Sequence, residues 1–436
     1  MNYQIITDSI AGLVAADKIS ESQNQVNIYI PNNANFNGFR SKNKNIGSRL
    51  IELHYQEHKN FSRNLSEYKQ EYKGHSTFMN TIGPYIQNLF DDELIEVNDP
   101  ELVINNQVYK DFLYGDYFQD LLLFLESSRD LSVKKSSFEK IQNKEQYNRY
   151  IQKYNNYLEL SRTLHPHSVH NLIKSILDKL NKNYTIQSKY HRVLWLPILW
   201  DSTINKIFEK KENIISDSKF YKPKNDNFNF VEKLVQQLNA KENININYFD
   251  KTEFKIERNQ IYIRDKKFCD NKNLILSINM NFFSNLFKDI ETTDVCEWNF
   301  KFYYIKTIHL LKNFSQISFA DSSYPYRVSY SKSDNEILSI CVENGLGDNS
   351  NLEVFKFLVN KKYLSENSLI NLTEESNLKI PFSMPTIRNE KIYNLKINKI
   401  SEIFNECIKL APLNFYQSSA LNEQIAQGLS IDANLK

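Results

Sequence analysis

The opening of the chain constrains its fold more than any other stretch. Residues 3–6 form a short apolar run that predicts a buried strand, and residues 7–12 form a tight turn. The apolar spacing of residues 13–19 predicts a helix packed on a sheet, and residues 26–30 predict a second strand that Pro31 ends. This order is a βαβ unit, so we expect an α/β fold built on a parallel sheet.

The turn of this βαβ unit is compared with the dinucleotide-binding fingerprint G-x-G-x-x-G. Its three glycine positions are Thr7, Ser9 and Gly12 in this sequence. Thr7 still permits a turn, and Gly12 permits close packing of helix against strand. Ser9 places a side chain where backbone would approach a pyrophosphate, and Ile30 stands where an acidic residue would hold a ribose. The pattern therefore predicts a Rossmann-like domain with a weakened phosphate contact.

A polar turn after the second strand adds a family resemblance. Residues 37–41 read Asn-Gly-Phe-Arg-Ser. With the βαβ opening, this turn resembles that of the FAD-dependent amine-oxidase-like flavoproteins, which include the UDP-galactopyranose mutases. In that family a G-G-x-R-like turn contacts the cofactor pyrophosphate. The resemblance therefore implies that Gly38 and Arg40 bind FAD beside the three loop positions.

The end of the chain carries the same resemblance. Residues 418–428 read Ser-Ser-Ala-Leu-Asn-Glu-Gln-Ile-Ala-Gln-Gly and look like the last helix of that family. The N-terminus of the family's helix lies against the flavin, where its N–H groups and dipole hold an oxygen. The resemblance implies that Ala420, Leu421 and Asn422 are cofactor contacts. We also expect both chain ends to meet in one Rossmann-like domain.

Two residues are candidates for binding a substrate. Residues 51–55 alternate in polarity, and in the resembling family a strand at this place leads toward the active site, which implies His54 beside the flavin ring. The alternative is a solvated His54 on a half-buried strand. Arg327 lies in a predicted strand, and basic residues of the corresponding family sheet meet an anionic substrate. The alternative is an exposed strand charge.

Other titratable residues give weak signals of chemistry. His165, His167 and His170 lie close together beside Pro166, but no carboxylate stands at a recognisable ligand spacing. We therefore expect a loop or helix start and no metal. The four cysteines lie far apart without a C-x-x-C pair, which argues against a zinc site or disulfide framework and favours a reducing compartment.

The middle of the chain predicts a second domain of helices and an antiparallel sheet, which the resemblance identifies as a substrate domain. We expect residues 392–395 to form the last core strand, with residues 396–399 replacing a glycine-containing pair that contacts the cofactor in the family. The expected dinucleotide-binding domain comprises residues 1–104, 228–299 and 380–436. The expected substrate domain comprises residues 105–227 and 300–379.

Composition excludes several classes of partner. The net charge of +2 over 436 residues gives no global field for nucleic acid or membranes, and no apolar run is long enough to span a bilayer. We expect a cytoplasmic protein.

The resemblance implies an FAD-dependent oxidoreductase or sugar mutase acting on a small molecule or nucleotide sugar, with a role in surface glycan biosynthesis. The degenerate loop leaves open a non-catalytic relative that has lost flavin binding.

Overall fold

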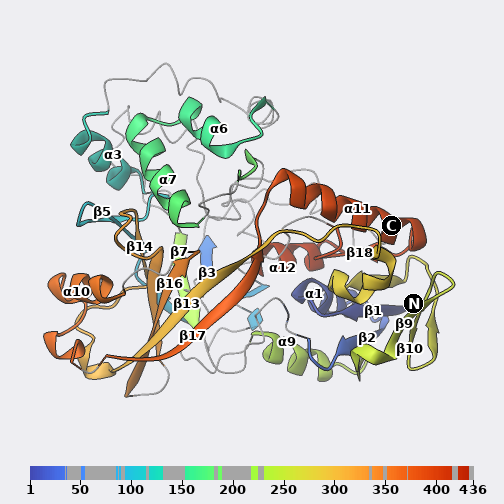
Figure 1. The fold of residues 1–436 in the computed structure, drawn as a ribbon. Coiled ribbons are helices and arrows are strands. Elements are labelled where there is room, and N and C mark those ends of the chain that lie inside the picture. The colour runs from blue at the N-terminus through green and yellow to red at the C-terminus, as the bar shows by residue number, and fades with distance from the viewer. Residues whose placement is uncertain are drawn as a thin grey trace.

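The structure is a computed structural model, and for some residues at the ends of its elements only the backbone is described. Two sheets organise it: a parallel sheet near both chain termini and a larger, mainly antiparallel sheet (Figure 1). We call the parts around them the parallel-sheet domain and the antiparallel-sheet domain. The described residues are 1–34, 36, 51–54, 85–86, 88–89, 94–113, 117–130, 153–180, 185–188, 218–223, 230–332, 336–346, 351–370, 372–414 and 421–431.

The parallel sheet has the strand order β18-β12-β1-β2-β8. Numbered along the chain, this is the order 3-2-1-4-5 of a doubly wound sheet, read from β8. Ile5 lies between Ile275 on one side and Ile28 on the other, and all three side chains are buried. The strands are β1 Asn2–Thr7, β2 Gln25–Pro31, β8 Ile244–Phe249, β12 Leu274–Ser277 and β18 Ile408–Lys409.

Layers on both faces explain why β12 and the second half of β1 are buried throughout, whereas the edge strand β8 alternates apolar and polar residues. One face is covered by α1 Ile10–Ser20, α9 Phe230–Asn239 and α12 Leu421–Leu429. The other face is covered by a small antiparallel sheet together with η6 and α11. These elements are β9 Phe254–Glu257, β10 Gln260–Ile263, β11 Lys266–Phe268, η6 Met280–Phe287 and α11 Ile387–Ile403.

The two chain ends meet in this domain, which confirms the expectation from the sequence. β18 pairs with β12 beside β1, and α12 packs on α1. The expected last strand at residues 392–395 is wrong, because these residues lie inside α11. Thr386 caps that helix by accepting a hydrogen bond from the Asn389 N–H at 3.2 Å. A short apolar run does not distinguish a strand from a helix. Here the N-cap at Thr386 favours the helix.

The larger sheet has the order β17-β13-β16-β15-β14-β5-β6 and is antiparallel except between β14 and β5. One face packs against α3, α6 and α7, and the other against α10. The predicted combination of helices with an antiparallel sheet is confirmed. The strands are β5 Glu101–Ile104, β6 Gln107–Lys110, β13 Val295–Lys306, β14 Gln316–Phe319, β15 Arg327–Lys332, β16 Ile337–Gly345 and β17 Thr373–Ser383. The helices are α3 Phe118–Ser127, α6 Tyr157–Leu164, α7 His167–Leu180 and α10 Leu352–Asn360.

A smaller sheet and several short elements complete the described chain. The three-stranded sheet has the order β3-β7-β4. The domain limits expected from the sequence stay a prediction. They assign residues 101–104 and 295–299 to the dinucleotide-binding domain, whereas hydrogen bonding places β5 and the whole of β13 in the larger sheet. The remaining elements are β3 Ile51–His54, β4 Leu94–Val97, β7 Ser218–Pro223, η5 Lys251–Glu253, η7 Thr307–His309 and η8 Glu366–Ser368.

Candidate functional site

The carboxyl end of β1 meets α1 beside β12, at the point where the strand order reverses. Ligands of doubly wound folds bind at this place. Thr7 closes the turn with its side chain: its Oγ1 accepts the Ser9 N–H at 3.0 Å, and its hydroxyl donates toward the Ser9 carbonyl at 2.8 Å and the Ser277 carbonyl at 3.0 Å. Side-chain hydrogen bonds therefore stabilise a turn that the first glycine makes in the fingerprint G-x-G-x-x-G.

Gly12 has the packing role that the sequence predicts. A Cβ atom at this position would lie 2.3 Å from Thr7 Oγ1 and 2.9 Å from Ser277 Cβ, too close for any side chain. Glycine therefore allows the first turn of α1 to approach β1 and β12. The helix axis is fixed directly over the switch point of the sheet.

The N-terminus of α1 is closed by side chains of this same chain. Ser9 is the N-cap, and its Oγ accepts the Ala11 N–H at 3.3 Å. Gln424 of α12 reaches across, and its Oε1 accepts the Ile10 N–H at 3.0 Å and the Ser9 hydroxyl at 2.8 Å. Ser9 and Gln424 are fully buried. The N–H groups of residues 9–11 therefore all have acceptors within the protein.

These contacts decide whether FAD, the cofactor that this fold implies, fits at the helix end. Its pyrophosphate would need the same N–H groups and an approach free of negative charge. Asp8 accepts the Asn279 N–H at 2.9 Å, and burial raises the pKa of its carboxyl to about 7. An ionised Asp8 would repel a phosphate. The residues here do not fit a pyrophosphate bound at the N-terminus of α1.

The end of β2, where the ribose would lie, also lacks the usual contact. Ile30 is buried in the core of the parallel-sheet domain. The next polar side chain, Asn32, donates from Nδ2 to Asp250 Oδ1 at 2.6 Å. Asp250 follows β8, so this carboxylate comes from the neighbouring strand and already has a partner.

Several residues implied by the resemblance have no described side chain. Gly38, Arg40 and Ala420 lie outside the described residues. Leu421 and Asn422 begin α12, and His54 ends β3, but only their backbone is described. Their proposed roles stay predictions.

Sequence reasoning missed Gln424, although a signal for it exists. Gly428 lies one turn further along α12, and a Cβ there would lie 2.5 Å from Val14 Cβ and 2.7 Å from the Ala11 carbonyl oxygen. Residues four apart share a helix face. A glycine in the last helix therefore marks the face that meets α1, and Gln424 lies on that same face.

Arg327 lies on the sheet of the other domain, as predicted, but inside an ion pair. Its Nε donates to Glu343 Oε2, and its Nη1 lies 3.4 Å from Gln316 Oε1. The side chains of Arg327 and Glu343 are 14% and 5% exposed, so the arginine charge is balanced within the protein. An anionic substrate would have to compete with the Glu343 carboxylate.

Buried polar atoms without partners lie near Arg327. A β-bulge interrupts the pairing of β13 with β16 at Asn299. Within the described part of the chain, Trp298 Nε1, Asn299 Oδ1 and both polar atoms of the Asn344 amide are buried and have no hydrogen-bond partner. Such groups are destabilising unless a water molecule or ligand pairs with them. We call these three side chains the bulge cluster.

The histidines pair with hydroxyl and amide groups. Ser161 Oγ lies 2.9 Å from His165 Nδ1 and 3.1 Å from His170 Nδ1, and burial lowers the pKa of His165 to about 3. His167 Nε2 lies 3.0 Å from Asn171 Nδ2. Within the described ranges, no group of three or more His, Cys, Asp or Glu residues is placed to hold a metal ion.

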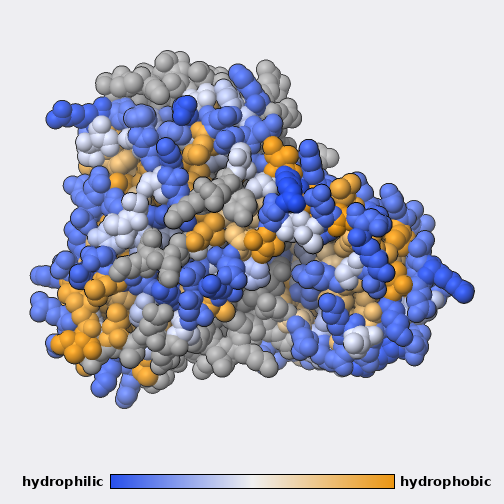
Figure 2. Space-filling model, in the orientation of Figure 1, coloured by the Kyte–Doolittle hydropathy of each residue, from blue (hydrophilic) through white to orange (hydrophobic). Residues whose placement is uncertain are grey.

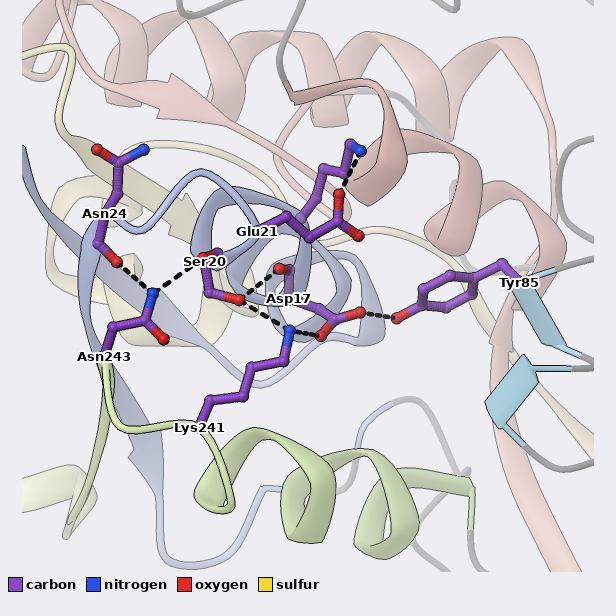
Figure 3. Close-up of polar contacts among 8 residues, drawn as sticks. Asp17, Ser20, Glu21, Asn24, Tyr85, Lys241 and Asn243 are labelled. Carbon is purple, nitrogen blue, oxygen red and sulfur yellow. Dashed lines mark hydrogen bonds and ion pairs between the residues drawn. The ribbon is translucent and has the colours of Figure 1, made fainter.

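A second polar cluster lies at the other end of α1, away from the site (Figure 3). Asp17 accepts Lys241 Nζ at 2.7 Å and the Tyr85 hydroxyl at 3.0 Å. Lys241 also donates to Ser20 Oγ at 2.9 Å. These groups satisfy one another, so the cluster fixes the end of α1 to the segment after α9.

None of the helices that the structure describes combines the length and hydrophobicity that a bilayer-crossing segment needs. No family's sequence model matches the chain, and no curated protein matches it significantly in sequence.

Solved structures match it over nearly its whole length. Reduced UDP-galactopyranose mutase superimposes with a TM-score of 0.57 at 11% identity, covering 99% of this chain and 92% of that one. An oxidoreductase from Methanosarcina mazei gives 0.51 at 9% identity, covering 100% of both chains. A protoporphyrinogen oxidase-like protein from Exiguobacterium sp. 255-15 gives 0.50 at 10% identity, covering 100% and 98%. The chain therefore has the fold of UDP-galactopyranose mutase and of these two other proteins, as the resemblance in its sequence implied.

Proposed function

We propose that this protein is a non-catalytic relative of the FAD-dependent oxidoreductases and sugar mutases, one that keeps their fold without holding flavin. The observation that carries the proposal is the pair of hydrogen bonds from Ser9 and Ile10 to Gln424 Oε1. They occupy the helix N-terminus at which the dinucleotide pyrophosphate would bind.

Displacing Gln424 would be unfavourable for two reasons. Its side chain is fully buried, so removing it from Ile10 leaves a buried donor unsatisfied until a ligand replaces it, which costs about 1–3 kcal/mol. The incoming group would be an anion beside the Asp8 carboxyl. A pyrophosphate would thus meet a filled site and a repulsive neighbour.

The experiment is a titration of the purified protein with FAD and with ADP, followed by calorimetry, together with its visible spectrum. We expect a colourless protein that binds neither ligand. The double variant Ser9→Gly with Gln424→Ala removes both internal partners, and we expect it to bind ADP more tightly than wild type. Gln236→Ala, an exposed position on α9, is the matched control. Flavin bands in the purified wild type, or saturable FAD binding, would contradict the proposal.

The second candidate function is an FAD-dependent oxidoreductase or sugar mutase that acts on a small molecule or nucleotide sugar, with a role in surface glycan biosynthesis. The likeness to UDP-galactopyranose mutase over 99% of the chain supports it. The bulge cluster supports it too, because unpaired buried polar atoms are what a bound substrate would satisfy. In this case Arg40→Ala weakens FAD binding by about one to two decades, since an arginine–phosphate bond is worth about 1.5–3 kcal/mol.

A further inference from the structure

Lys179 is a buried lysine that fixes the connection between β14 and β15, residues 320–326. Lysines ordinarily lie on a hydrophilic surface such as the one in Figure 2, whereas Lys179, in the last turn of α7, is 5% exposed. Its Nζ donates to the Phe319 carbonyl at 2.8 Å and to the Pro325 carbonyl at 3.3 Å. These carbonyls stand near the two ends of the connection, so a single amine fastens both ends to α7.

Further hydrogen bonds hold the connection between its ends. Ser175, one turn earlier on α7, donates from Oγ to the Ala320 carbonyl at 2.6 Å. The Asp321 carboxylate accepts the N–H of Asn105, in the turn between β5 and β6, at 3.0 Å. The connection is therefore fastened on one side to α7 and on the other side to the hairpin of β5 and β6.

The surroundings of Lys179 offer little compensation for a positive charge. Among the residues that the structure describes, its Nζ bonds to backbone carbonyls and forms no ion pair with a carboxylate. Burial lowers the pKa of Lys179 to about 7, and the charge of Asp321 opposes this only in part. An ionised amine is therefore destabilising in the closed connection, because its charge is removed from water without a charged partner.

The other ionisable groups on the packed elements are neutral, already bonded or exposed. Burial raises the pKa of the Tyr324 and Tyr326 hydroxyls, so both stay neutral near pH 7. Among these groups, Lys179 is the one whose charge the closed structure leaves without a charged partner. The others are Tyr324 and Tyr326 on the connection, Asp111 after β6, the Arg327–Glu343 ion pair of β15 and β16, and Lys174 and Asp178 on α7.

We propose that the connection between β14 and β15 is a pH-sensitive clasp, which opens when Lys179 is ionised and closes when it is neutral. A neutral amine keeps two N–H groups, enough for both carbonyls, whereas an ammonium group gains hydration when the connection opens. Opening also frees the start of β15, where the Tyr326 N–H donates to the Glu343 carbonyl at 2.9 Å. The inference does not depend on whether FAD binds.

The direction of the pH response follows from the two pKa values. A solvated lysine has a pKa of 10.5 and Lys179 in the closed form one of about 7, so opening takes up a proton between these pH values. The ratio of open to closed protein should rise up to about tenfold for each unit by which pH falls toward 7, and should then level off. His165 responds at lower pH, below 6.5, so the two effects are separable.

The test is hydrogen exchange of the full chain, measured by mass spectrometry on peptides that cover residues 319–326, between pH 9 and pH 6. Lys179→Met is the reference, because its side chain is of similar length and never ionises. Comparing the two proteins at equal pH cancels the intrinsic pH dependence of exchange. We expect exchange in the wild type, relative to Lys179→Met, to rise by up to about a hundredfold from pH 9 to pH 7 and to change little below it.

Two further variants isolate the charge. Lys179→Arg stays ionised throughout, so we expect fast exchange of the connection at every pH, and this variant serves if Lys179→Met does not fold. Lys174→Met, at an exposed position on α7, should behave as the wild type. Equal exchange in the wild type and Lys179→Met at every pH, or slow exchange in Lys179→Arg, would overturn the proposal.

A titration of the wild type alone gives an answer that needs no variant. In protein labelled with carbon-13 at the lysine side chains, we expect one lysine resonance to titrate near pH 7, about three units below the others. Titration of every lysine above about pH 9 would also overturn the proposal, because Lys179 would then stay ionised in the closed form.

Discussion

The turn after β1 and the bulge between β13 and β16 differ in whether their buried polar groups are hydrogen-bonded. At the turn, Thr7, Ser9 and Gln424 pair with one another and with the N–H groups of α1. At the bulge, within the described chain, Trp298 and Asn344 have buried polar atoms that pair with nothing. A fully paired cluster stabilises the fold and resists a ligand, whereas an unpaired one is completed by a ligand. Among these two places, the unpaired buried polar atoms thus lie at the bulge in the antiparallel sheet and not at the turn where a dinucleotide would bind.

Two glycines provide the largest expected effect. Gly12→Ala should reduce the free energy of unfolding by about 3 kcal/mol, because its Cβ would lie 2.3 Å from Thr7 Oγ1, 2.6 Å from Thr7 Cβ and 2.9 Å from Ser277 Cβ. Gly345→Ala, at the end of β16, should cost about 1–2 kcal/mol, since its φ is +66° and its Cβ would lie 3.0 Å from the Lys179 carbonyl. Urea unfolding measures both. Equal losses would show that the turn is no more tightly packed than the end of β16.

Gln424 provides the next test. Gln424→Ala should lower the free energy of unfolding by about 2 kcal/mol, because the buried Ile10 N–H loses its acceptor. Gln236→Ala, exposed on α9, should change it by less than about 0.5 kcal/mol. If both variants unfold at the same urea concentration, Gln424 does not stabilise the turn, and the contrast between the two regions disappears.

The protonation of Asp8 should make the stability contributed by the turn after β1 depend on pH. Its pKa is about 7 in the folded protein and 3.8 when solvated, so the folded state holds the proton more tightly. Stability should therefore fall as pH rises from about 4 to 7 and stay low above it. Asp8→Asn should remove this dependence, a gain of about 1 kcal/mol at pH 8 after allowing for partial exposure. Melting curves at pH 5 and pH 8 check it, and a flat wild-type profile would exclude a buried Asp8 carboxyl.

His165 should give the antiparallel-sheet domain the opposite response. Burial lowers its pKa from 6.5 to about 3, so the unfolded state takes up a proton first as pH falls below 6.5. We expect amides of α6 and α7 to lose protection from hydrogen exchange, relative to those of α1, between pH 7 and pH 5. Uniform protection across both domains would contradict the assignment of acid sensitivity to His165.

Local pattern in the sequence predicted the strands and helix of the βαβ unit, because apolar periodicity and turn residues act over a few positions. Asn105 and Asn106 also suit the hairpin turn between β5 and β6, because asparagine tolerates the φ angles of +50° and +62° found there. Local pattern failed at residues 392–395, where a helix cap outweighed an apolar run. It missed Gln424 because that contact joins residues 415 positions apart. Whether Arg327 was free or paired depended on Glu343, which only the pairing of β15 with β16 brings beside it.

The smallest expected effect tests the bulge cluster, where the polar side-chain atoms have no partner. Asn344→Leu keeps the approximate volume of the side chain and removes two polar atoms that have no described partner. Because no hydrogen bond is lost, the free energy of unfolding should change by less than about 1 kcal/mol, or rise. Asn351→Leu in the same domain is the control, since it breaks a 2.7 Å bond to the Tyr303 hydroxyl and should cost more than Asn344→Leu, about 1 kcal/mol or more. A larger loss in the free energy of unfolding for Asn344→Leu than for Asn351→Leu would mean that the Asn344 amide is already paired in solution, for instance with ordered water. The polar groups of the bulge cluster would then be as fully paired as those of the turn after β1.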